Sequence, residues 1–270
     1  MKLSKILFGA VAAAAVMGLV SCGGDDPNGM IKGSGKKYTI DYENNENAVS
    51  RGYKDTATKH AGALVKVTFE NIAQTADATV TTMGGVMGCI FDLKDGENGK
   101  DFSVIGIQNK NNILKYYISS YTGVSDLQAN NFGAPNLPDY AGDGVAAETV
   151  VTDFTVISDS LKDTTDDNLA VYIYFVQTAT AEDDYDYNVY ILPKSVVDTV
   201  AKIKDADLGV LKDEEGNDID ISSYKVGTCN TSYTSLTQKD FAVYANVYAY
   251  SSVSGTWNIL DTYKEAEVIE

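Results

Sequence analysis

Short segments in which apolar and polar residues alternate recur along this chain, and they constrain its fold more than any other feature. In the segment 63–69, for example, Val65, Val67 and Phe69 point one way and the residues between them point the other, as in a half-buried β-strand. Ten further segments, rich in Val, Ile, Tyr, Phe or Thr and bounded by Gly, Asn or Asp, are predicted to be strands. They are 37–42, 86–93, 101–108, 113–121, 149–158, 169–177, 185–192, 219–226, 240–250 and 256–260.

The turns between these segments predict how the strands are arranged. Asp95-Gly96 and Asn98-Gly99 stand between two of them and supply the positive φ angles that tight hairpins need. Strand signals often recur after about a dozen residues, which is typical of antiparallel sandwiches and barrels. The chain is therefore predicted to be all-β: an antiparallel β-sandwich, jelly-roll or lectin-like, of about ten strands with one short helix.

The helix is predicted directly after Pro193. Proline is favoured in the first turn of a helix, and Val196, Val197, Val200 and Ile203 fall on one side at helical spacing. We expect this helix to lie on a sheet face or to cap one end of the sandwich.

The N-terminus carries the pattern of an export signal. Lys2 and Lys5 give a basic start, and residues 6–20 form an apolar, charge-free run that is shorter than the ~20 residues a membrane-spanning helix needs. The run leads into Leu19-Val20-Ser21-Cys22, which resembles the lipobox of bacterial lipoproteins. In that family the chain is cut just before the cysteine, and the cysteine thiol is acylated.

The resemblance implies a division of the chain and a location. Residues 1–21 would be the lipoprotein signal peptide, 22–36 a flexible tether and 37–270 a single β-sandwich domain. Cys22 would carry fatty acyl chains such as palmitate and anchor the protein to a membrane of the cell envelope. Aspartate after the cysteine favours the inner membrane in well-studied Gram-negative lipoproteins, so Gly23 favours the outer membrane, on its periplasmic or its surface face.

Composition narrows the partners. A hydrophobic fraction of 44% and 18 tyrosines indicate a packed core. The formal net charge of −17 disfavours nucleic acid and anionic lipid surfaces as partners, although solubility is the simpler explanation of the charge.

Two cysteines remain once Cys22 is lipidated. Cys89 and Cys229 both stand in strand-like segments. A disulfide between them is compatible with an oxidising envelope, and two buried free thiols are equally compatible with the sequence.

Residues for catalysis are sparse. A Ser or Cys nucleophile needs a base, usually histidine, and His60 is the single histidine, in a polar stretch where we expect a surface or loop position. Zinc sites need more His and Cys ligands than this chain offers. The paired-carboxylate strand patterns of sandwich glycosidases, Glu-x-Asp-x-x-Glu and Glu-x-Asp-x-Glu, are absent from the sequence. The chain is therefore predicted not to be an enzyme.

No cofactor is expected, with calcium as the one candidate. Asp92, Asp95 and Asp101 crowd into the glycine-bent segment 92–101, and calcium takes six to eight oxygen ligands. The alternative is that Asp, Asn and Gly are the residues that hairpin turns prefer.

Tyrosines are the candidate ligand-binding residues. Alternation places Tyr244, Tyr248 and Tyr250 on one face of the segment 240–250, and Tyr172 and Tyr174 on one face of 169–177. If these strands are neighbours, their rings form an exposed ladder able to bind a glycan or a protein. Alternatively, the tyrosines stabilise the sheet by cross-strand pairs or lie under the helix after Pro193.

These observations favour a membrane-anchored envelope lipoprotein whose β-sandwich is a binding module for a glycan or for an envelope or host protein. The alternative is a structural or assembly lipoprotein that docks another envelope protein and has no small-molecule ligand.

Overall fold

The computed structural model describes twelve stretches of the chain, and all structural statements below refer to them. They are residues 29–45, 50–70, 85–97, 99–110, 113–124, 154–164, 168–181, 184–200, 203, 210–233, 239–248 and 251–263. Residues 1–28, which include the expected signal peptide and Cys22, and the segment 125–153 lie outside them.

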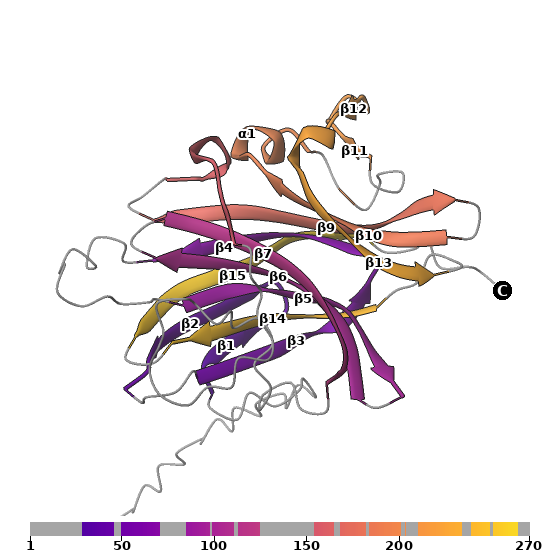
Figure 1. Ribbon diagram of the computed structural model, residues 1–270. Coiled ribbons are helices and arrows are strands. Elements are labelled where there is room, and N and C mark those ends of the chain that lie inside the picture. Colours follow the sequence, from indigo (N-terminus) through magenta and orange to yellow (C-terminus); the bar gives the residue numbers. More distant parts are fainter. Residues whose placement is uncertain are drawn as a thin grey trace, which may run out of the picture.

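Two antiparallel sheets stacked face to face form the molecule, as Figure 1 shows. The seven-stranded sheet has the order β1 (Ile31–Ser34), β2 (Lys37–Glu43), β15 (Ser252–Tyr263), β4 (Gly62–Phe69), β9 (Leu169–Ala181), β10 (Asp184–Leu192) and β13 (Lys225–Tyr233). The six-stranded sheet has the order β3 (Ser50–His60), β14 (Lys239–Val247), β5 (Gly85–Gly96), β6 (Gly99–Lys110), β7 (Ile113–Val124) and β8 (Thr155–Val156). The predicted all-β antiparallel sandwich is confirmed.

Short elements lie beside the seven-stranded sheet. They are the helix α1 (Lys194–Val197), the strand pair β11 (Leu211–Lys212) and β12 (Asp218–Ile219), and the 3₁₀ turns η2 (Asp159–Leu161) and η5 (Ser222–Tyr224). Figure 1 places α1, β11 and β12 together above β9 and β10. The helix is a single turn and is shorter than the helix predicted from the apolar spacing of residues 196–203. It is short because β-branched Val196 and Val197 have low helix propensity.

Several strands differ from the predicted ones. Strand β3 was not predicted because it carries few apolar residues, and it lies at an edge of its sheet where little burial is needed. Its last residue, His60, is buried against Phe241, with ring centroids 5.6 Å apart, so the expected surface position is wrong. The sheet also begins before residue 37, since β1 lies within the predicted tether and buries Ile31.

The main core lies between the sheets and consists mostly of inward residues from strands of both sheets. Trp257, the single tryptophan, is fully buried there, and its Nε1–H donates to the Gly88 carbonyl oxygen at 3.0 Å. This bond joins β15 of one sheet to β5 of the other. Cys89 and Cys229 are both buried and both free. Of the two alternatives, a disulfide or two buried thiols, the structure therefore has the two thiols.

A second apolar layer covers the outward face of each sheet. Tyr172 and Tyr174 belong to a cluster beside α1 and β11, whereas Tyr244 and Tyr248 belong to a cluster on the six-stranded sheet. All four are buried. The predicted exposed ladder is therefore wrong for them, because β9 and β14 lie in different sheets and each face is packed. Tyr250 lies outside the described residues.

None of the helices in the described stretches is long and apolar enough to cross a membrane.

Burial of these tyrosines predicts a pH dependence. Five buried tyrosine hydroxyls have a pKa above the usual value of about 10, and burial is the largest cause in each case. They are the hydroxyls of Tyr117, Tyr174, Tyr187, Tyr244 and Tyr248. In the unfolded chain the same hydroxyls ionise near pH 10. Because the folded-state pKa is the higher one, their contribution to stability is complete below about pH 10 and is lost as the pH rises further.

We therefore expect the tyrosine absorbance of the native protein to titrate in two steps. Exposed tyrosines ionise near pH 10, and the buried set ionises only when the chain unfolds at higher pH. In denaturant all tyrosines should titrate together near pH 10. A single step near pH 10 for the native protein would contradict the burial.

Candidate functional site

One row of side chains crosses the outward face of the six-stranded sheet at its centre. The cross-strand register aligns Tyr53, Tyr244, Gly88, Gly106 and Tyr117, on β3, β14, β5, β6 and β7 in turn. Residues directly opposite one another in an antiparallel pair share a face, so we call these five the tyrosine row. The row thus has three tyrosine rings, and its two positions on β5 and β6, Gly88 and Gly106, carry no side chain.

The two glycines let the rings of this row lie against the sheet. A Cβ at Gly106 would overlap with the Tyr117 ring and the Tyr244 hydroxyl, and a Cβ at Gly88 would come within 2.7 Å of Tyr244 Cε1. The Tyr117 and Tyr244 hydroxyls meet over this pair in a hydrogen bond. Phe154 packs edge-on against Tyr117, with ring centroids 5.4 Å apart. The centre of the face therefore consists of buried aromatic rings packed close to bare backbone.

A second row beside it is polar. Register aligns Arg51, Asn246, Val86, Gln108 and Lys115 across the same five strands, and we call these five the polar row. Both amides are almost completely buried, at 1% exposure for Gln108 and 0% for Asn246. Arg51 and Lys115, at the two ends, are partly exposed.

Tyr248, just beyond the end of β14, adjoins the polar row and is 3% exposed. Burial raises the pKa of its hydroxyl, against smaller lowering effects from Gln108 and Arg51. Burial likewise lowers the pKa of Arg51, and Tyr248 partly reverses this. These effects place the three side chains in one electrostatic neighbourhood.

Two polar atoms in this neighbourhood lack well-formed hydrogen bonds. Among the described residues, neither Gln108 Nε2 nor the Tyr248 hydroxyl makes a hydrogen bond of good distance and angle, although both are buried; the contact they make is with each other, where Gln108 lowers the pKa of the Tyr248 hydroxyl. Buried polar groups are nearly always paired, and an exception calls for an explanation such as strain, a functional role, or a bound water or ion.

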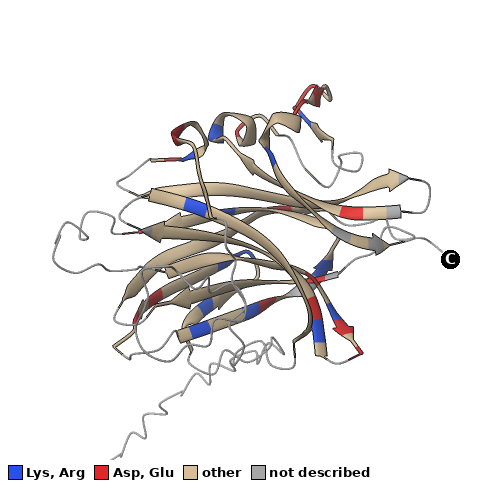
Figure 2. Cartoon of the chain, in the orientation of Figure 1, with Lys and Arg blue, Asp and Glu red and all other residues tan. Residues whose placement is uncertain are grey.

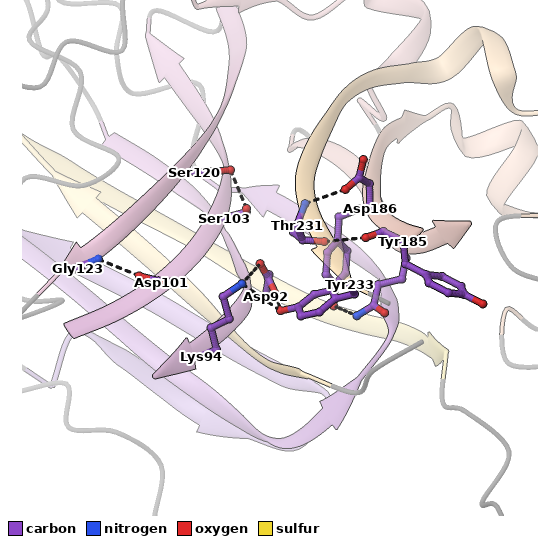
Figure 3. Close-up of polar contacts among 12 residues, drawn as sticks. Asp92, Lys94, Asp101, Ser103, Ser120, Gly123, Tyr185, Asp186, Thr231 and Tyr233 are labelled. Atoms are coloured by element: carbon purple, nitrogen blue, oxygen red, sulfur yellow. Dashed lines mark hydrogen bonds and ion pairs between the residues drawn. The ribbon is translucent and has the colours of Figure 1, made fainter. Parts of the chain in front are cut away.

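A different polar cluster lies where β5 of one sheet approaches β13 of the other. Figure 3 shows Asp92, Lys94 and Tyr233 pointing toward one another. The Tyr233 hydroxyl donates to Asp92 Oδ1, and Lys94 Nζ lies 3.5 Å from Asp92 Oδ2. Asp92 has a φ of 59° at a break in the register between β5 and β6, which is characteristic of a β-bulge. The bulge turns the Asp92 side chain toward Tyr233, and their hydrogen bond joins the two sheets.

The three candidate calcium ligands make separate contacts. Asp92 is held by Tyr233 and Lys94, Asp95 pairs with Lys100, and Asp101 Oδ1 accepts from the Gly123 N–H at 2.9 Å. Within the stretches that the structure describes, no group of three or more His, Cys, Asp or Glu side chains is arranged to hold a metal ion.

Sequence analysis missed most of the polar row. Asn246 lies on the same face as Tyr244 and Tyr248 by simple alternation, but Gln108 ends a predicted strand and Arg51 belongs to a strand that was not predicted. The available signal was Gly88 and Gly106 inside two strand segments, since an isolated strand glycine marks a close approach.

Comparisons with known proteins gave structural matches only. No protein-family model matches the chain, and no curated protein is similar to it. It is similar in structure to alginate lyase Aly36B in a variant bound to an alginate trisaccharide, at 11% identity and a TM-score of 0.36, covering 85% of each chain. It is also similar to the marine PL-14 alginate lyase from Aplysia kurodai, at 10% identity and a TM-score of 0.32, covering 83% of this chain and 80% of that one.

These matches correct one prediction. The chain was predicted not to be an enzyme, and the solved structures that it matches are those of lyases. At these identities and TM-scores the comparison assigns no role to any residue of this chain.

The glycine pair under the tyrosine rings generates a stability prediction. Gly106→Ala should lower the free energy of unfolding by about 1–3 kcal/mol, because the added methyl displaces two buried rings. Gly227→Ala is the matched control, since its Cβ would meet only the flexible end of Ile118, at 2.7 Å from Cδ1. Urea unfolding followed by circular dichroism measures both. Equal midpoints for the two variants would show that the rings do not rest on Gly106.

Proposed function

We propose that the protein binds a glycan on the outward face of the six-stranded sheet, over the tyrosine row and the polar row. The observation that carries the proposal is the buried polar pair Gln108 and Tyr248: neither Gln108 Nε2 nor the Tyr248 hydroxyl makes a well-formed hydrogen bond with a described residue, and the two side chains adjoin each other. They stand beside the rings of Tyr117 and Tyr244, which lie close to the backbone of Gly88 and Gly106.

A carbohydrate suits this combination of groups. Sugar rings have apolar C–H faces, which pack on aromatic rings, and hydroxyls, which both donate and accept hydrogen bonds. Amide and phenol groups such as Gln108, Asn246 and Tyr248 can do both as well. Ligand sites typically combine an aromatic lining with a few such polar groups.

Burial of the face sets a condition on binding. Gln108, Asn246 and Tyr248 are almost inaccessible, so a ligand that reaches them must first displace what covers them. Association that requires such a rearrangement is slower than rigid docking.

The buried Tyr248 hydroxyl gives a direct test. Tyr248→Phe should leave the free energy of unfolding nearly unchanged, because the hydroxyl makes no well-formed hydrogen bond with a described residue. It should also weaken glycan binding about three- to tenfold, by the loss of one hydrogen bond to the ligand. Calorimetry of the full chain against a panel of neutral and acidic polysaccharides measures the affinity, and the sizes of the polysaccharides afterwards report any cleavage.

Tyr174→Phe is the matched control, since its buried hydroxyl also lacks a partner among the described residues but lies on the other sheet. We expect it to bind glycans as the native chain does. Native protein that binds no polysaccharide, or equal weakening by the two variants, would overturn the proposal.

We also propose that the chain is a lipoprotein of the cell envelope, anchored through Cys22 in the outer membrane. The support is the lipobox-like Leu19-Val20-Ser21-Cys22 after a basic start and an apolar run. Two or more acyl chains, at ~0.8 kcal/mol per buried methylene, give a stable anchor.

Cys22→Ala should therefore move the protein from the membrane fraction to the soluble fraction of expressing bacteria and abolish incorporation of labelled palmitate. Cys89→Ala, which alters a buried thiol in β5, should remain membrane-bound and labelled. Labelling that persists in the Cys22 variant would refute the anchor.

A further inference from the structure

A hairpin with three exposed lysines forms one edge of the seven-stranded sheet. Its strands β1 and β2 are joined by the two-residue turn Gly35-Lys36, because the register pairs Ser34 with Lys37 and Gly35 has the positive φ of 64° that tight turns need. Lys32, Lys36 and Lys37 are all exposed, and we call them the hairpin lysines. The turn end of the hairpin thus presents three cations to solvent.

The described part of the chain does not neutralise these cations. Lys32 and Lys37 lie on the outward face of the sheet, because their neighbours Ile31 and Tyr38 are buried in the main core. None of the ion pairs among the described residues includes a hairpin lysine. Asp41 stands diagonal to Lys32 in the register, and no ion pair joins the two. The three ammonium groups can therefore bind an external anion.

The basic character of this edge contrasts with the rest of the chain. Residues 29–60 contain six basic and four acidic side chains, whereas residues 61–270 contain 13 basic and 32 acidic ones. Figure 2 shows basic positions on the strands β1 to β3, whereas acidic positions gather at the β11–β12 hairpin. Exposed charges farther apart than about 8 Å are largely screened at physiological ionic strength. The total charge of −17 therefore does not decide what this edge attracts.

The same hairpin is the described element closest in sequence to the proposed lipid anchor. Met30, which directly precedes β1 and is buried, follows Cys22 by eight residues. An extended chain spans at most about 3.6 Å per residue, so Met30 lies within roughly 29 Å of Cys22. Strand β13, at the other edge of the same sheet, is six interstrand steps farther away, or roughly 29 Å more. The anchor therefore holds the β1 edge nearer to the membrane than the β13 edge.

We infer that the hairpin lysines dock on anionic lipid headgroups and orient the sandwich with its β1 edge toward the membrane. This inference rests on the proposed lipid anchor, which brings the hairpin to the lipid surface. Lysine binds a phosphate group as a point charge, and basic residues near a membrane are attracted to anionic lipids within a Debye length of the surface. In this orientation the β13 edge points away from the membrane.

The experiment measures how close the turn lies to lipid. The lipidated full chain is labelled with a fluorophore at Ser34→Cys and reconstituted on vesicles that carry a headgroup-linked quencher. Ser34 is exposed beside the turn, whereas Cys89 and Cys229 are buried. Quenching should be about twofold stronger on phosphatidylcholine with about 30% phosphatidylglycerol than on phosphatidylcholine alone, because only the former is anionic. High salt should remove the difference, since it screens exposed charges.

Two triple variants separate docking from total charge. Replacing the three hairpin lysines by glutamine should abolish the difference in quenching between the two lipid compositions. The matched control replaces Lys115, Lys212 and Lys225, on β7, β11 and β13, by glutamine. It changes the net charge by the same amount and should keep the twofold difference, because these lysines lie away from the β1 edge.

Flotation of the vesicles distinguishes the possible failures. Stronger quenching on anionic vesicles, lost only when the hairpin lysines are replaced, supports the inference. Equal quenching on both lipid compositions while the protein floats with the vesicles overturns the inference and leaves the anchor intact, and so does an equal loss in the two triple variants. Protein that floats with neither kind of vesicle counts against the proposed anchor itself.

Discussion

The approach of two tyrosine rings to bare backbone at Gly88 and Gly106 is the constraint on which the rest of this structure depends. Gly88 makes close contacts on both faces of its sheet. Its carbonyl accepts from Trp257 between the sheets, and its Cα face receives Tyr244 on the outside. Side chains at the two glycines would separate the rings from the sheet. The main core and the candidate site therefore meet at one residue of a central strand.

Each sheet of this protein is packed on both of its faces. A sandwich needs only one buried face per sheet, yet this chain has a second apolar layer on the outside of each sheet. On the seven-stranded sheet that layer lies beside α1, β11 and β12, and its buried carboxylate, Asp163, is held by Tyr172 and Lys66. On the six-stranded sheet it borders buried amides, and this difference is why only the latter face is assigned a ligand.

Alternation in the sequence located the regular strands well and the irregular ones poorly. The predicted strands 63–69 and 185–192 match β4 and β10 to within one residue, because one face of each is apolar. Strand β3 has no apolar face, and β13 begins within the predicted strand 219–226 and runs on to Tyr233. In β13 the polar and small residues after Val226 concealed the strand.

Which strands are neighbours was beyond the reach of sequence patterns. Tyr172 and Tyr244 have the same alternating context, yet they lie in different sheets, because β14 pairs with β3 and β5 while β9 pairs with β4 and β10. The pairing of β14 with β3 joins residues nearly two hundred positions apart. Contacts of that range depend on the packing of the whole chain, and the two rows of the site exist only through them.

The central claim, that a glycan binds across the outward face of the six-stranded sheet, is tested most directly by NMR. Backbone amide shifts of the isotope-labelled protein are followed while an oligosaccharide of the polysaccharide that binds in calorimetry is added. The account predicts that the perturbed amides cluster along both rows, around Arg51, Asn246 and Gln108, while those of β9 and β10 stay unchanged. Shifts confined to the other sheet, or to the Asp92 and Tyr233 cluster, would contradict it.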